Sequence, residues 1–137
     1  MPRPKRSSEI DKSEKITINL GMVDLGQIDL LVAEGFFANR TDFIRTAIRR
    51  QLESRSAAVE SMVVRRSLTL GSEHYSRAQL EELRTAGQMV EVRVLGLATI
   101  AEDVSPELAL ATIAAVEVLG AFRASAAVKA ALATRTT

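Results

Sequence analysis

The chain has 137 residues, 47% of them apolar, with a net charge of +1 and no cysteine. Its length allows one or two small domains with packed cores, and its composition is not that of a disordered chain. The lack of cysteine excludes disulfides, and a single histidine, His74, argues against a histidine-rich metal site. The longest uncharged apolar run, residues 108–116, is too short for a bilayer span of about 20 residues. We therefore expect no cofactor, no metal and no membrane partner.

Residues 1–12 are predicted to form a flexible basic arm. Arg3, Lys5 and Arg6 lie together beside Pro2 and Pro4, and two prolines discourage regular structure. The segment has no apolar core of the kind found in signal peptides, which favours a cytoplasmic location.

Residues 15–20, KITINL, alternate between polar and apolar side chains. In a strand this alternation places Ile16, Ile18 and Leu20 on one face. Lys15, Thr17 and Asn19 then occupy the opposite face, and their amine, hydroxyl and amide groups suit base edges and phosphates. A lone strand leaves its backbone groups unpaired, so we expect this strand to pair with a second copy of itself.

Two short amphipathic helices are predicted next. The first carries an apolar stripe over residues 25–32, with Asp24 as its expected cap and Gly35 as its C-terminal stop. Phe36 and Phe37 are expected to fill the gap between the helices.

The second helix has a strong start signal, because Asn39 can cap it and Asp42 follows three residues later. A helix N-terminus favours anions, so Arg40 and Thr41 are candidates for holding a phosphate; the alternative for Arg40 is a surface ion pair. Phe43, Ile44, Ala47, Ile48 and Leu52 are predicted to form the buried stripe.

The runs EKITINL, VDLGQIDLLVAEG and NRTDFIRTAIRRQL closely resemble the ribbon-helix-helix family of CopG, Arc and MetJ type, over residues 13–55. The resemblance implies an intertwined homodimer whose two strands form an antiparallel ribbon in the major groove of double-stranded DNA. It assigns base reading to Lys15, Thr17 and Asn19, and phosphate binding to Asn39, Arg40 and Thr41. Many members open the first helix with proline, whereas this chain has Gly21-Met22-Val23.

Residues 56–64 are predicted to link the halves, by extending the second helix, and residues 65–137 show a period of 24. Leu68 and Leu70 recur as Val92 and Val94 and then as Val116 and Val118, while Gly71 falls one residue early relative to Gly96 and Gly120. Leu80, Val104 and Val128 follow the same period. Each unit reads as a strand, a glycine turn and a helix, with Ser76, Ser105 and Ser125 as N-caps. The pattern predicts an αβ solenoid-like repeat, and the alternative is a ferredoxin-like βαββαβ domain with residues 95–101 as a further strand.

The fold class expected for the whole chain is therefore α+β. The expected function is that of a sequence-specific DNA-binding transcriptional regulator, a repressor in a prokaryotic cytoplasm and not an enzyme. The repeats are predicted to mediate oligomerisation, since an open-ended solenoid exposes its terminal faces; sensing of a small ligand is the other possibility. Two alternatives for the function are an antitoxin of a toxin–antitoxin pair and a DNA-associated structural or partition protein that polymerises.

Overall fold

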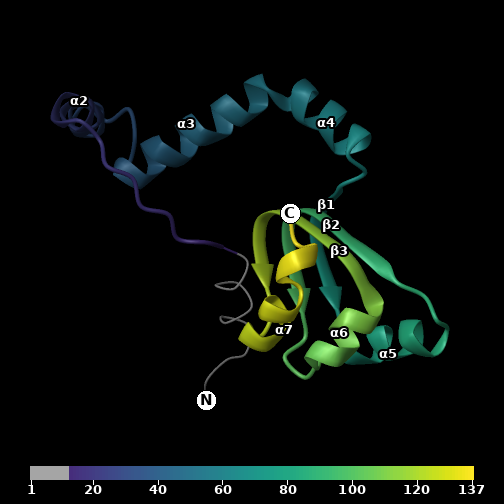
Figure 1. The fold of residues 1–137 in the computed structure, drawn as a ribbon. Helices are drawn as coiled ribbons and strands as arrows, with labels where there is room; N and C mark the ends of the chain where they lie inside the picture. The colour runs from purple at the N-terminus through teal and green to yellow at the C-terminus, as the bar shows by residue number, and fades with distance from the viewer. Residues whose placement is uncertain (1–12) are drawn as a thin grey trace, which may run out of the picture. The chain divides into compact units, whose positions relative to one another are not determined.

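The structure, a computed structural model, describes residues 13–137. The predicted basic arm, with Arg3, Lys5 and Arg6, lies outside the described residues. The chain divides into two compact units, which split between Met62 and Val63 and are described separately below. Figure 1 shows a helical first unit and a second unit built of strands and helices.

The first unit is helical. Helix α2 spans Met22–Ala33, helix α3 spans Arg40–Ser54, and helix α4, Ser56–Arg65, crosses the division between the units. Only Arg55 separates α3 from α4, and its carbonyl accepts a hydrogen bond from Val59 N at 3.0 Å. The segment predicted as a linker is therefore helical, as an extension of the second helix requires.

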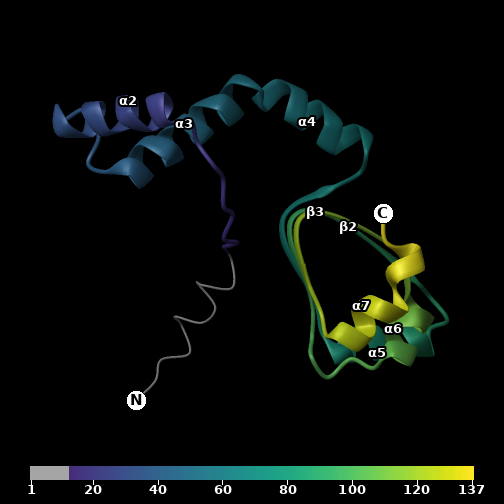
Figure 2. The ribbon, with the colours of Figure 1, turned by 60° about the vertical axis from the view of Figure 1, so that its left-hand side comes forward.

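The second unit alternates strands with helices. Its elements are β1 (Thr69–Tyr75), α5 (Arg77–Thr85), β2 (Val90–Ile100), α6 (Pro106–Thr112), β3 (Ile113–Arg123), α7 (Ala126–Ala131) and the 3-10 turn η1 (Ala133–Arg135). The strands form one parallel sheet in the order β1-β2-β3, with successive strands joined through a helix. Figures 1 and 2 show α5, α6 and α7 together on the same side of this sheet.

The apolar core of the second unit lies between the sheet and these helices. Strand β2 buries Val92, Val94, Ala98 and Ile100 there, strand β3 buries Ile113 and Val116, and each helix adds one or more aliphatic side chains. The buried set comprises Leu80, Val92, Val94, Ala98, Ile100, Val104, Leu108, Ala109, Ile113, Val116, Val128 and Leu132. Each fully buried aliphatic side chain stabilises the fold by about 1.5–3 kcal/mol before conformational entropy is counted, so this unit has its own core.

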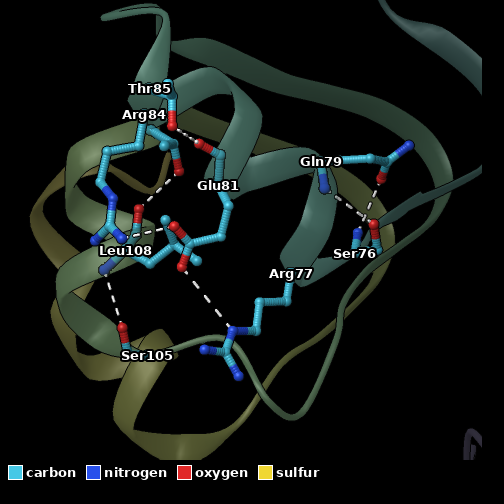
Figure 3. A network of polar contacts seen from close by, with 9 residues as sticks. Ser76, Arg77, Gln79, Glu81, Arg84, Thr85, Ser105 and Leu108 are labelled. Carbon is cyan, nitrogen blue, oxygen red and sulfur yellow. Dashed lines mark hydrogen bonds and ion pairs between the residues drawn. The ribbon is translucent and has the colours of Figure 1, made fainter.

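All three serine N-caps are confirmed. The side chains of Ser76, Ser105 and Ser125 accept hydrogen bonds from the backbone N–H three residues ahead, at 3.1–3.2 Å. Gln79 completes a capping box by accepting from Ser76 N at 2.9 Å, which Figure 3 shows. Local sequence therefore sets where each helix begins.

Three glycines form a ladder across the sheet. Gly71 pairs with Gly96, which pairs with Gly120, and their φ angles are +121°, +140° and +120°. A Cβ on Gly96 would overlap the carbonyl oxygen of Gly71, and a Cβ on Gly120 would overlap that of Gly96. At Gly71, on the edge strand, a Cβ would meet nothing within 4 Å. Adjacent strands thus require glycine at the second and third rungs for space as well as for conformation.

Two expectations for the repeat are corrected. The glycines lie inside the strands and not in turns after them. Residues of β1 pair with residues of β2 that lie 25 positions later in the chain, so Leu70 is opposite Leu95 and not Val94. Leu70 is accordingly 69% exposed and is not equivalent to a core valine. Between β2 and β3 the spacing of 24 is correct, because Val92 pairs with Val116.

The ferredoxin-like alternative is wrong. A ferredoxin-like sheet needs antiparallel neighbours, whereas both strand pairs here are parallel. Residues 95–100 do not form a separate strand but continue β2. Of the residues predicted at equivalent positions, Leu80 and Val128 lie in helices, whereas Val104 lies in the loop before α6, although all three are buried.

Candidate nucleic-acid interface

The segment predicted as a ribbon is exposed in the single chain. The only sheet among the described residues is β1-β2-β3, and residues 15–20 are not part of it. Lys15, Thr17 and Asn19 are exposed, as a surface that contacts DNA requires. The apolar alternation is exposed as well, with Ile16 at 77% and Ile18 at 62%.

Burial in the first unit is far below that of a folded domain. Among its described residues, Ile28 alone is a buried apolar side chain. The exposed large apolar side chains of this unit are Ile16, Ile18, Leu20, Met22, Val23, Leu30, Phe36, Ile48, Leu52 and Met62. A hollow of about 330 Å³ lies between the helices, lined by Leu20, Ile28, Leu31 and Phe43 among others. So much exposed apolar surface is typical of an interface with another chain.

Helix α2 begins earlier than predicted. Its N-cap is Gly21, and Asp24 lies in the first turn instead of capping the helix. A carboxylate there still stabilises the helix, because it faces the positive end of the helix dipole. Gly21 has no capping side chain, and the helix opens with Gly21-Met22-Val23 where many members of the resembled family have a proline.

Helix α2 stops just before Gly35, as the sequence predicts. Gly35 has φ +84°, its N–H donates to Val32 O, and Phe36 N donates to Leu31 O, which together make a Schellman motif. Phe37 packs edge-to-face on Phe43 with 5.0 Å between ring centroids. Phe36 is 71% exposed, so the prediction that both rings fill the gap is wrong for this one in the single chain.

The start of α3 is set by two side-chain contacts. Asn39 Oδ1 accepts from Asp42 N at 2.8 Å, which confirms the predicted cap. Asp42 Oδ2 accepts from Ala38 N at 2.9 Å, so its carboxylate turns back outside the helix. Among the described residues no group accepts from the backbone N–H of Arg40 or Thr41. These two donors are the ones that an oxyanion could use.

Arg40 makes a bidentate ion pair within its own chain. Its Nε donates to Asp29 Oδ1 at 2.7 Å and its second guanidinium nitrogen donates to Asp29 Oδ2 at 2.8 Å, which ties α3 to α2. The hydrogen bonds lower the pKa of Asp29 below its ordinary value and raise that of Arg40. The pair therefore contributes to stability above the ordinary pKa of an aspartate, and its contribution is lost as the pH falls through the lowered pKa. Sequence reasoning missed Asp29, although the alternative of a surface ion pair for Arg40 is the contact observed.

Comparison with known proteins identifies the group to which these features belong. The model of the ribbon-helix-helix transcriptional regulator family matches residues 11–129. The chain belongs to this family. The match runs well beyond residues 13–55 and covers the αβ unit as far as residue 129, so most of this unit lies within the region that the family shares. No curated protein and no solved structure matches the chain.

The described part of this ribbon-helix-helix chain has neither a membrane-spanning helix nor a cluster of metal ligands. No helix among residues 13–137 is long and apolar enough to cross a membrane. In the same part of the chain, no three His, Asp or Glu side chains gather in a way that could hold a metal ion.

Replacing Asp29 with alanine separates the two roles of Arg40. If the guanidinium also contacts DNA, Asp29→Ala frees it and removes a nearby negative charge, and affinity for any duplex should rise a few-fold. If Arg40 serves only to join the helices, affinity should stay unchanged or fall. Fluorescence anisotropy with a labelled duplex at fixed salt measures the difference. Glu53→Ala, which removes an exposed carboxylate at the far end of α3, is the control for net charge.

Proposed function

We propose that this protein is a transcriptional repressor that reads DNA sequence with a two-stranded antiparallel ribbon. Residues 15–20 of two chains would pair across a two-fold axis and enter the major groove, which admits such a ribbon. Membership in a family of transcriptional regulators supports a DNA-binding role. The observation that carries the proposal is the apolar row of Ile16, Ile18 and Leu20, whose side chains are 77%, 62% and 41% exposed in the part of the chain that the structure describes.

Dimerisation follows from the energetics of the first unit. About fifty residues with a single buried aliphatic side chain bury too little surface to fold alone. Pairing two copies would satisfy the backbone groups of both strands and bring their apolar rows over the hollow beside Ile28. We therefore expect an obligate dimer in which folding of this unit depends on protein concentration.

The proposed contacts divide between specificity and affinity. Lys15, Thr17 and Asn19 would read base edges from the outward face of the ribbon. Asn39, Arg40 and Thr41 would bind phosphate at the start of α3, where two backbone N–H groups are available. The basic residues Arg3, Lys5 and Arg6 would add phosphate contacts that do not depend on sequence.

The test is Asn19→Ala, measured against a library of duplex sequences. The expected result is a flattened preference at one base position, equivalent to about 1–3 kcal/mol, with affinity for random DNA little changed. Removal of residues 1–8 is the matched control, because it should weaken binding to all sequences and lower the salt dependence. The proposed division fails if both changes act alike on every sequence.

The αβ unit is proposed to mediate oligomerisation of such dimers. Its sheet has two edge strands, β1 and β3, and a buried apolar core of its own supports them. The second candidate function, a DNA-associated structural protein that polymerises, gains support from the same two edges. Both place the protein on DNA in the cytoplasm and differ in how far assembly proceeds.

A further inference from the structure

The two ends of the αβ unit are unlike each other and both are open. Strand β1 with helix α5 forms one end, and strand β3 with helix α7 forms the other (Figure 1). Each end has a hollow of about 450 Å³. Glu73, Glu82 and Leu83 help to line the first, while Phe122 and Lys129 help to line the second. In the interior of the unit these positions are filled by the next strand and helix.

At the first end of the αβ unit, the space beside Gly71 is unoccupied among the described residues. Gly71 holds a φ of +121° although a Cβ there would meet nothing within 4 Å. Gly96 and Gly120 hold the same kind of angle with the preceding glycine carbonyl against their Cα. Beside Gly96 and beside Gly120, the equivalent space is occupied by the carbonyl of the preceding glycine, whereas beside Gly71 it is empty. The carbonyl of Gly120 has, by the same repeat, no following glycine to meet.

The register at the second end leaves room for a further strand. Thr136 forms a parallel bridge with Val116, and Thr137 N donates to Val116 O at 2.9 Å. Continuing the observed register, a strand equivalent to β1 would start opposite Val118, since Thr69 pairs with Val94 and Val94 pairs with Val118. The C-terminal residues therefore occupy the rung just before that strand and not the strand itself.

Charge distinguishes the two ends. Within the described residues, Glu73 and Glu82 at the first end form no ion pair, and neither does Lys129 at the second. The neighbouring Glu81 differs, since Arg77 and Arg84 flank its carboxylate (Figure 3). Glu73 and Tyr75 both line the first hollow; burial raises the pKa of Tyr75, and the nearby charge of Glu73 raises it further. An acidic end and a basic end favour contact between unlike ends.

We propose that αβ units of different dimers stack end to end, with β1 and α5 of one copy docking on β3 and α7 of the next. The partner is a second copy of this chain. The docking strand would pair with residues 118–123, place its Gly71 against Gly120 O, and bring Glu82 toward Lys129. Such a head-to-tail contact leaves one end of each docked unit free, so further dimers can be added in series. The inference rests on the proposed function for its dimeric building block and adds to it the surfaces that join dimers.

Charge reversal tests the stack on the full-length chain. Sedimentation equilibrium of the unchanged chain should give an average mass that rises with concentration beyond twice the 14.9 kDa chain mass. Lys129→Glu and Glu82→Lys should each weaken this association about tenfold, and the double reversal should restore most of it. Glu102→Lys, an equal charge change in the exposed loop before α6, should leave the association unchanged. Circular dichroism confirms that each variant is folded.

Gly71→Ala is a second, uncharged test. The added Cβ has free space within its own chain but would overlap Gly120 O of the docking copy, so association should be lost while the sheet persists. A mass fixed at twice the chain mass at all concentrations overturns the proposal. A closed tetramer that is indifferent to both charge reversals also overturns it, because it indicates pairing of like edges. If assembly starts from single chains yet still responds to the reversals, the stack stands and the ribbon dimer fails.

Discussion

Gly96→Ala is expected to unfold the αβ unit at moderate temperature. Alanine there must hold a φ of +140°, and its Cβ overlaps the carbonyl oxygen of Gly71 and lies 3.0 Å from its carbon. The unfavourable backbone conformation costs about 1–3 kcal/mol and the forced shift of a packed strand about 1–3 kcal/mol more. A domain of this size loses about 4–8 °C in Tm for each kcal/mol, so the expected loss exceeds about 10 °C.

Gly71→Ala is the matched control for that prediction. It imposes nearly the same φ, +121°, without the overlap, because a Cβ there has open space. Its free energy of unfolding should therefore fall only by the conformational part, about 1–3 kcal/mol. Urea unfolding followed by circular dichroism, at a concentration too low for association, compares the two. Equal losses in both variants would contradict the role given to close strand contact.

Ile18→Asp is expected to abolish both dimerisation and DNA binding. Ile18 is 62% exposed in the single chain, so the change leaves the αβ unit intact. In the ribbon dimer the same side chain would face the shared core, and each chain would then bury an unpaired carboxylate. Specific affinity should fall at least about 100-fold. Sedimentation in the Lys129→Glu background, in which stacking is weakened, measures the loss of dimer.

Thr17→Asp is the control for this second prediction. It introduces the same charge one residue away, on the face that we assign to DNA, and should leave the dimer mass unchanged while DNA binding is lost through repulsion of phosphates. The contrast depends on the two faces of the strand. If both variants remain dimeric, the apolar row is not the dimer interface.

The local parts of this structure were predictable from sequence because short-range rules govern them. The caps at Asn39, Ser76, Ser105 and Ser125 were all located correctly, since each needs only a side-chain acceptor and the N–H three residues on. Gly35 was correctly placed at the end of α2 for a similar reason. The start of α2 was placed three residues late, at Asp24 instead of Gly21, because Gly21 caps the helix without a side chain and leaves no signal in the sequence.

The long-range parts were less predictable. A period of 24 indicated the repeat but misassigned Leu70. Strand β1 pairs with β2 at a constant spacing of 25, and a shift of one residue turns Leu70 to the face opposite that of Val94. The pairing of Arg40 with Asp29 depends on how two helices meet and has no counterpart in local sequence. The proposed base-reading residues are exposed as expected, but their pairing in a ribbon stays a prediction.

The sequence by itself determined the class of this protein. The resemblance of the runs EKITINL, VDLGQIDLLVAEG and NRTDFIRTAIRRQL indicated the ribbon-helix-helix family, and the family model that matches residues 11–129 confirms it. Only the tertiary structure showed that Gly71, Gly96 and Gly120 form one ladder and that the space beside Gly71 is empty. The physical reason is that glycine in sequence indicates only permitted backbone angles, whereas the atom opposite its Cα is set by the neighbouring strand.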